Sequence, residues 1–245
     1  MTHIKICGIK EEVHALAAVE AGADLIGLVF APSRRQVTPA KAYHIVTTIK
    51  KTPNLVKVVG VFVNMPAAEV NKIADFCALD RVQLSGDESW EYCRKITRPI
   101  IKAIRINQQH LGELYAELAA GARILFTRPL PNIPQRFIPL LDSQVEGKYG
   151  GTGLTFNWKL AQQAAKRFPV IIAGGLNPHN VAQLIELVAP WGVDVSSGVE
   201  VEGTKDVAKI KVFIEAVRKV DENRRQQLPD LSGYFEQFGA GISKL

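Results

Sequence analysis

Chemically reactive side chains stand at the ends of several predicted strands in this chain of 245 residues. Cys7 follows the run IKI, Asp142 follows FIPLL, and Asp194 lies within GVDV. A thiol and a carboxylate that face each other across one site can act as general base and general acid. Each residue also has an ordinary structural interpretation. A cysteine in an apolar strand is often a small core residue, and an aspartate often caps a helix or orders a loop. The spacing alone leaves both interpretations open.

Two successive strands end in small residues that suit a phosphate group. Gly174 and Gly175 follow VIIA, and Ser196, Ser197 and Gly198 follow GVDV. Such ends leave backbone N–H groups uncovered and allow the close approach that a phosphate requires. One glycine-rich end would be explained by an ordinary turn. Two successive ends, one of them with two serines, favour a phosphate site.

Three further polar residues lie at or just after strand ends: Arg35, Gln83 and Arg105. Arg35 can be either a ligand-binding residue or a solvated surface charge, and Arg34 is interpreted as the latter. The net charge of +6 comes from scattered Lys and Arg residues with no basic stripe among aromatics. This pattern indicates a solvated surface that attracts a small anionic substrate, and it does not favour a nucleic-acid partner.

The elements that must position these residues alternate between apolar runs and segments of helical period. The expected strands are Ile4–Ile9, Leu25–Phe30, Val56–Val63, Arg81–Leu84, Ile100–Ile106, Phe137–Leu141, Val170–Ala173 and Gly192–Val195. Eight strand–helix alternations with short connections predict a single closed (β/α)₈ TIM barrel, in which the C-terminal strand ends share one mouth. An open doubly wound sheet is the rival architecture, but no GxGxxG follows the first strand.

The sixth strand is ambiguous. Both Arg123–Phe126 (RILF) and Phe137–Leu141 (FIPLL) have strand-like composition, and Pro139 is awkward inside a central parallel strand. The second run is preferred because it leads directly into Asp142. The expected helix before it covers Leu111–Ala120.

Composition limits the class of protein further. With 47% hydrophobic and 22% charged residues the chain is typical of soluble globular proteins, and no apolar run approaches the length of a membrane helix. Three cysteines without paired spacing predict a reducing, cytoplasmic setting and no disulfide framework. No motif predicts a metal site or a cofactor.

The motifs together resemble phosphoribosylanthranilate isomerase, an enzyme family of tryptophan biosynthesis. The resemblance runs from residue 4 to about residue 220 through KICGI, GLVFAPSRRQV, VGVFVN, VQLSGDE, IIKAIRI, LLDS, GGTGLTFNW, AGGLNPHNV and GVDVSSGVE. It implies the (β/α)₈ fold and a cofactor-free Amadori rearrangement of N-(5-phosphoribosyl)anthranilate, an aldose-to-ketose isomerisation.

The resemblance also implies roles for residues of this chain. Cys7 matches the family's base and Asp142 its acid, while Asp194 matches the carboxylate that holds the anthranilate amino group. Arg35 matches the arginine that lies against the aromatic ring. The phosphate would bind backbone donors around Gly174, Gly175, Ser197 and Gly198. A loop expected to close over the substrate contains Gly150, Gly151 and Gly153.

These roles make physical demands. A free thiol has a pKa of about 8.5, so a base at residue 7 needs help to ionise, and Lys5 and Arg105 are the nearby candidates. The acid, Asp142, must conversely be protonated for part of the time, which requires a partly desolvated site.

The chain departs from the family pattern at Ser85, where a histidine is usual, and at Asn157, where an aspartate is usual.

Residues 221–245 are expected to form a C-terminal extension to a domain of residues 1–220, and their sequence resembles the start of tryptophan synthase β chains. Two alternatives stay open: a related phosphosugar barrel such as indole-glycerol-phosphate synthase, and a non-catalytic phosphate-ligand binder. The sequence permits either a monomer or a homodimer.

Overall fold

A computed structural model describes residues 1–106, 111–126, 137–142 and 158–227 of the chain. Its eight main strands are His3–Cys7 (β1), Leu25–Val29 (β2), Lys57–Phe62 (β3), Arg81–Leu84 (β4), Ile100–Arg105 (β5), Phe137–Asp142 (β6), Ile171–Ala173 (β7) and Gly192–Val195 (β8). They pair in parallel in the order of the sequence, and β8 pairs with β1, so the sheet closes into a barrel. The predicted (β/α)₈ fold is confirmed.

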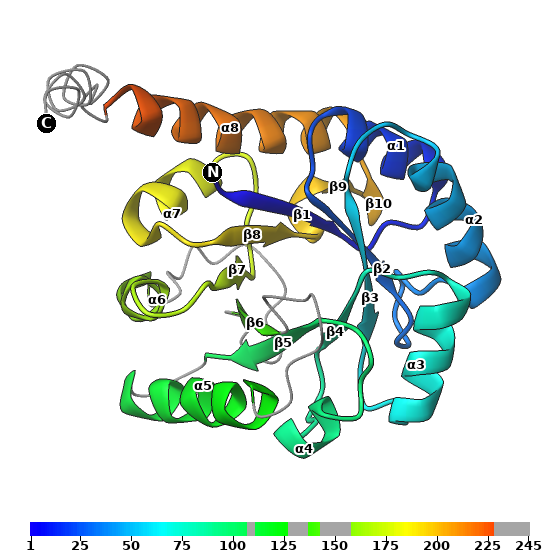
Figure 1. Ribbon diagram of the computed structural model, residues 1–245. Helices are drawn as coiled ribbons and strands as arrows, with labels where there is room; N and C mark the ends of the chain where they lie inside the picture. The colour runs from blue at the N-terminus through cyan, green and yellow to red at the C-terminus, as the bar shows by residue number, and fades with distance from the viewer. Residues whose placement is uncertain (107–110, 127–136, 143–157, 228–245) are drawn as a thin grey trace, which may run out of the picture.

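Helices cover the outside of the barrel (Figure 1). They are Glu12–Glu20 (α1), Pro39–Lys50 (α2), Ala67–Phe76 (α3), Trp90–Cys93 (α4), Leu111–Phe126 (α5), Trp158–Ala165 (α6), Val181–Val188 (α7) and Val207–Gln226 (α8). Between β8 and α8 lie a short 3₁₀ turn, Ser197–Val199, and a two-stranded antiparallel hairpin of Glu200–Val201 (β9) and Thr204–Lys205 (β10).

Alternation along the strands divides the core into two layers. Even-numbered residues of β1, such as Ile4 and Ile6, pack outward against the helices. The barrel interior is a separate apolar cluster made of Leu25, Val59, Ile101, Ile138, Leu140, Ile171 and Ala173. Because side chains alternate between the two faces of a strand, the odd-numbered residues of β1 and the even-numbered residues of β6 and β8 share that interior.

The sixth strand is Phe137–Asp142, as predicted. Its pairing with β5 is continuous from Ile100↔Phe137 to Arg105↔Asp142, with Pro139 opposite Lys102. The rival run at residues 123–126 instead forms the last turns of α5, which is therefore six residues longer than the expected helix that ended at Ala120.

Asn177 and Pro178 are typical of a helix start, because Asn can cap a helix and Pro suits its first turn. In the structure residues 178–180 instead form a turn, and helix α7 begins at Val181. The side chains of Asn177 and Asn180 bond to the local backbone: the Asn177 carboxamide accepts from His179 N and the Asn180 carboxamide accepts from Asn177 N. Four residues of α7 with the spacing of one apolar stripe are all buried: Val181, Leu184, Ile185 and Val188.

The two ends of the barrel domain are joined by a buried hydrogen-bonded pair. The Asp221 carboxylate on α8 accepts from Thr2 N at 2.7 Å and from the Thr2 hydroxyl at 2.9 Å. Arg218, one turn earlier, donates to Thr2 O at 2.9 Å. Helix α8 thus continues past residue 220 to Gln226, and the domain division after residue 220 stays a prediction. None of the helices in the described ranges is long and apolar enough to span a membrane.

We expect Asp221→Ala in the full chain to lower the free energy of unfolding by about 3 kcal/mol, because it leaves buried donors of Thr2 without their charged acceptor. Urea denaturation measures the change. The control is Glu222→Ala, since Glu222 is exposed on the same turn of α8 and should be nearly neutral. Equal losses in the two variants would contradict the importance of this link.

Candidate active site

A lysine is completely buried inside the barrel, next to the predicted catalytic thiol. Lys5 is 0% exposed, and its Nζ lies 3.0 Å from Asp194 Oδ1. The two residues are direct neighbours in the β1–β8 register. Burial alone would lower the pKa of Lys5, but the Asp194 carboxylate and the Cys7 sulfur raise it above its ordinary value. Lys5 is therefore an ammonium group.

Cys7 ends β1 on the same face as Lys5, with 8% of its surface exposed. Its neighbour across the sheet is Gly27. A Cβ on Gly27 would lie 2.9 Å from Cys7 Sγ and 3.1 Å from Lys5 Nζ, so the sulfur and the ammonium pack against the bare backbone of this glycine. The absence of a side chain at Gly27 is what makes room for both groups.

Opposing effects act on the Cys7 thiol. Burial raises its pKa, the Lys5 ammonium lowers it through charge and a hydrogen bond, and the Asp194 carboxylate raises it again. The net direction is upward, so the ligand-free protein holds the protonated thiol. Lys5, with a smaller contribution from Lys205, is the cation that favours the thiolate. Arg105, the other candidate from the sequence, instead lies 4.0 Å from the exposed Asp87.

Asp142 is the last residue of β6 and is half-buried. It shares the strand face of Ile138 and Leu140, both of which belong to the barrel interior. Its register neighbours are Arg105 on one side and Ala173 on the other. Cys7, Asp142 and Asp194 thus all stand at or near the C-terminal ends of their strands, on the face that looks into the barrel.

The two glycine-rich strand ends lie against each other. Gly174 and Gly175 have φ angles of 94° and 67°, and nothing lies within 4 Å of where a Cβ on Gly175 would stand. A Cβ on Gly198 would collide with the carbonyl oxygen of Leu176. The Ser197–Val199 turn therefore packs directly on the loop after β7, and only glycine permits this approach at residue 198. The two strand ends are thus in direct backbone contact at residue 198.

Arg35 is held by an acidic residue that the sequence analysis did not single out. Its Nε donates to Glu200 Oε1 at 2.6 Å and its Nη2 donates to Glu200 Oε2 at 2.8 Å. Arg34 also donates to Glu200, at 2.8 Å. The Arg34 side chain is 58% exposed and that of Arg35 is 23% exposed. The sequence indicates a solvated surface charge at Arg34, but this residue also pairs with the buried carboxylate of Glu200.

The β9–β10 hairpin supplies the residues that the sequence analysis missed. Lys205 is opposite Glu200 in the register, and its Nζ donates to Glu200 Oε1 at 2.7 Å and to Ser196 O at 2.9 Å. The Ser196 hydroxyl in turn donates to Cys7 O at 3.1 Å. The only sequence feature that points to this hairpin is the glycine at residue 203. In the structure Glu202 and Gly203 both have positive φ, as a two-residue hairpin turn requires.

Ser85, which replaces the family's usual histidine, lies beside the strand residue Gln83. The Gln83 Nε2 donates to Ser85 Oγ at 3.0 Å, while Gln83 Oε1 is buried and lacks a hydrogen-bond partner among the described residues. A buried carboxamide oxygen of this kind is suited to accept a hydrogen bond from a bound hydroxyl group.

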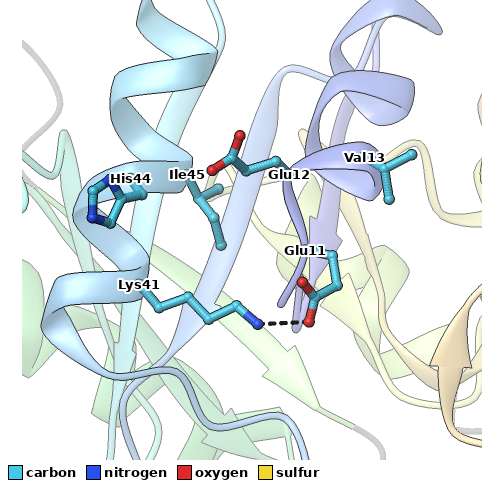
Figure 2. Close-up of a pocket in the computed structure, with 6 residues that line it drawn as sticks. All are labelled: Glu11, Glu12, Val13, Lys41, His44 and Ile45. Atoms are coloured by element: carbon cyan, nitrogen blue, oxygen red, sulfur yellow. Dashed lines mark hydrogen bonds and ion pairs between the residues drawn. The ribbon is translucent and has the colours of Figure 1, made fainter.

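Some predicted features lie outside the described residues, namely Gly150, Gly151, Gly153 and Asn157. Within the described ranges no cluster of His, Cys, Asp or Glu is arranged to hold a metal ion. A hollow of about 590 Å³ lies elsewhere, on the outer surface between α1 and α2 (Figure 2). Its polar lining includes the ion pair of Lys41 and Glu11 together with Glu12 and His44, and it shares no residue with the barrel mouth.

The fold and the candidate site together define a (β/α)₈-barrel protein whose candidate functional groups are gathered at the C-terminal mouth, which is where enzymes of this fold carry out their chemistry. Over residues 4–216 the chain matches the family described as N-(5'-phosphoribosyl)anthranilate (PRA) isomerase. The chain belongs to the N-(5'-phosphoribosyl)anthranilate isomerase family.

Individual relatives agree with this membership. The chain is 45% identical to N-(5'-phosphoribosyl)anthranilate isomerase of Dehalococcoides mccartyi, over 91% of this chain and 99% of the relative. It is 46% identical to that of Moorella thermoacetica, over 91% and 92%. The crystal structure of phosphoribosyl anthranilate isomerase from Thermotoga maritima superposes with a TM-score of 0.75 at 39% identity, over 89% of this chain and all of that one.

A further solved structure bears on the ligand of the family. It is a phosphoribosyl anthranilate isomerase in complex with reduced 1-(o-carboxyphenylamino)-1-deoxyribulose 5-phosphate. It matches with a TM-score of 0.71 at 38% identity, over 89% of this chain and 100% of that one.

We expect two substitutions to move the reactivity of Cys7 in opposite directions. Lys5→Met removes the cation that lowers the pKa of the thiol, so alkylation by iodoacetamide near neutral pH should slow. Asp194→Asn removes the anion that raises this pKa, so alkylation should accelerate. Peptide mass spectrometry locates the label.

Cys77 and Cys93 serve as internal controls, because both are fully buried with pKa values raised to about 11. A change of the same sign in both variants would indicate loosening of the barrel instead.

The hydrogen bonds on Glu200 predict a characteristic acid dependence of stability. Burial alone would raise the pKa of Glu200, but hydrogen bonds from Arg35 and Lys205 lower it from 4.5 to about 2. A lowered folded-state pKa contributes stability that is fully present above pH 4.5 and is lost as the pH falls towards 2. We therefore expect the free energy of unfolding of the native chain to exceed that of Glu200→Gln at pH 4.5 and above. This difference should shrink by an amount on the order of 3 kcal/mol as the pH falls from 4.5 to 2. Urea denaturation across the interval tests this, and a difference independent of pH would refute it.

Proposed function

We propose that this protein converts N-(5-phosphoribosyl)anthranilate to 1-(2-carboxyphenylamino)-1-deoxyribulose 5-phosphate by an Amadori rearrangement, a step of tryptophan biosynthesis. The observation that carries the proposal is the gathering of Cys7, Asp142 and Asp194 at one barrel mouth beside the paired glycine loops, in a member of this enzyme family. A cytoplasmic location is part of the same proposal.

In the first step the Asp142 carboxyl gives its proton to the furanose ring oxygen. The bond between that oxygen and C1 breaks, and the nitrogen lone pair forms the C1=N double bond of a protonated Schiff base. Asp142 is suited to this role because it ends β6 at the mouth, where a ribose ring above the glycine loops would be within its reach.

In the second step the Cys7 thiolate removes the proton from C2. The electrons of the C2–H bond form a C1=C2 double bond, and the electrons of the C1=N bond return to nitrogen. The product is an enolamine, which becomes the ketone when C1 gains a proton and the C2 hydroxyl loses one. No electrons or atoms are exchanged with a cofactor, and the proton taken by Cys7 returns to Asp142 through solvent between turnovers.

The resting thiol must ionise for this mechanism, and Lys5 is placed to assist. Its ammonium group has no exposed surface, so its charge acts on the sulfur with little screening by water. The Asp194 carboxylate opposes it in the ligand-free protein. When Asp194 engages the anthranilate amino group, its negative charge is shared with the ligand, and the balance shifts towards the thiolate. Substrate binding would in this way activate the base.

The remaining contacts bind the two ends of the substrate. The phosphate would lie on the backbone surface formed by Gly174, Gly175, Ser197 and Gly198, with its charge balanced by the basic mouth. The anthranilate ring would lie against the flat guanidinium of Arg35, which attracts both the ring and its carboxylate. Family membership favours this enzyme over the non-catalytic binder considered from the sequence.

We expect Cys7→Ser and Asp142→Asn each to lower kcat by roughly 10²- to 10⁴-fold, the usual contribution of one acid–base group. Turnover is followed by the change in anthranilate fluorescence when fresh phosphoribosylanthranilate is added. Circular dichroism and urea denaturation check that each variant is folded, and Cys93→Ala is the matched control because Cys93 is buried on α4, away from the mouth. Native rates in either site variant would refute its assigned role, and absence of turnover in the unmodified protein would refute the function.

A further inference from the structure

The Glu200 carboxylate collects three cations in one place. Its side chain is 4% exposed and receives hydrogen bonds from Arg34, Arg35 and Lys205. Two of these cations come from the loop after β2 and one from the β9–β10 hairpin. The cluster therefore joins two loops that are about 165 residues apart in the sequence. With three positive charges and one negative charge, it keeps a positive excess at the mouth.

The side chain of Arg35 is fixed on two sides. Its aliphatic stem lies over Gly8, the residue after Cys7, because a Cβ on Gly8 would lie 2.5 Å from Arg35 Cδ. Its guanidinium makes two parallel hydrogen bonds to the two oxygens of Glu200. A bidentate pair of this kind fixes the plane of the guanidinium as well as its position. Tilting this plane would lengthen or break at least one of the two hydrogen bonds.

The support for Glu200 reaches the catalytic strand. Lys205 is buried, and it bonds to Glu200 and to the backbone of Ser196, whose hydroxyl bonds to the carbonyl of Cys7. The hairpin turn at Gly203 lies close to Arg34, since a Cβ there would be 3.2 Å from Arg34 Nη1. The position of the carboxylate is thus determined by the same backbone that holds the thiol.

We propose that Glu200 is a positioning residue for the aromatic part of the substrate: it holds the Arg35 guanidinium in the plane against which the anthranilate ring lies. The inference rests on the proposed function, since it assumes that Arg35 contacts this ring. Because the guanidinium is already fixed before the substrate binds, binding does not carry the entropic cost of ordering a long side chain. Glu200 thereby sets the preference for an aromatic amine over other phosphosugars without touching the ligand.

The first test compares two ligands on Glu200→Gln, which keeps the shape of the side chain and removes its charge. The aromatic probe is reduced 1-(o-carboxyphenylamino)-1-deoxyribulose 5-phosphate, and the control probe is ribose 5-phosphate, which lacks the ring. Calorimetric titration should show that Kd for the aromatic probe rises roughly 10- to 100-fold. Kd for ribose 5-phosphate should stay within about twofold, whereas a collapse of the loops would weaken both probes alike. Equal losses for the two probes would overturn the proposal.

The second test is a double-mutant cycle with Arg35→Met, read in KM and kcat. If Glu200 acts through Arg35, Glu200→Gln raises KM in the native background with kcat changed much less, and it adds nothing in the Arg35→Met background. Equal effects in both backgrounds would overturn the positioning role while leaving the reaction assignment intact. A native KM in Arg35→Met would refute the contact with the ring, and the positioning role with it.

Two further variants protect the interpretation. Glu200→Asp retains the charge on a side chain one methylene shorter, so it should fold even if Glu200→Gln does not, and it should show a smaller loss of the same ring-specific kind. Asp24→Asn weakens a part-buried ion pair with Arg218, which also bonds to Thr2 O before the start of β1. It should lower stability without changing the ratio of the two Kd values, and a changed ratio would count against the proposal.

Discussion

A charged group with no access to water needs a partner of opposite charge, and in this barrel the fully buried ammonium of Lys5 has that need. An unpaired ammonium in the interior would cost several kcal/mol, so the carboxylate of Asp194 must remain within bonding distance. The pairing fixes the register of β1 against β8, the strands at which the barrel closes. Once Lys5 and Asp194 are aligned, Cys7 stands one pleat nearer the mouth, over the bare backbone of Gly27. The placement of the thiol follows from the pairing of the lysine.

The apolar layer below these groups has an electrostatic effect as well as a packing one. The interior cluster of β2, β3, β5, β6 and β7 fills the middle of the barrel with branched side chains and excludes water from below. Charges at the mouth are consequently solvated from one side only, and their mutual interactions are stronger than on an open surface. Modest displacements of a carboxylate or a cation there change the protonation of the sulfur more than they would elsewhere.

Much of the architecture could be predicted because strands buried on both faces must be continuously apolar, and eight such runs appear with short connections. Two local features could not. Residues 123–126 have strand-like composition, but Leu114, Leu118 and Leu125 are buried along one side of α5, so the helix continues through them. The Asn177 and Asn180 side chains bond to nearby backbone, and α7 starts only after them. Asn can cap a helix or stabilise a turn, and the sequence does not decide between these two roles.

The site was predictable where a strand carries the residue, and less so where two loops meet. Fold topology alone places Cys7, Asp142 and Asp194 at one mouth. The partner of Arg35 depends on how the loop after β2 meets the β9–β10 hairpin, and no short-range pattern records a contact across so long a stretch of chain. The contribution of Ser196 is hidden for the same reason, because its hydroxyl bonds to a main-chain carbonyl 189 positions away.

Closure of β1 against β8 has a consequence for biosynthesis. The strand that carries the thiol leaves the ribosome before the other seven strands of the barrel, and the strand that neutralises its neighbouring lysine is the last of the eight to leave. Until then the nascent polypeptide has an open sheet edge and an ammonium without a counterion, and long-range parallel pairing of this kind is slow to form. The candidate site is therefore assembled only after β8 has been synthesised, and until then β1 remains one of the open edges of the sheet.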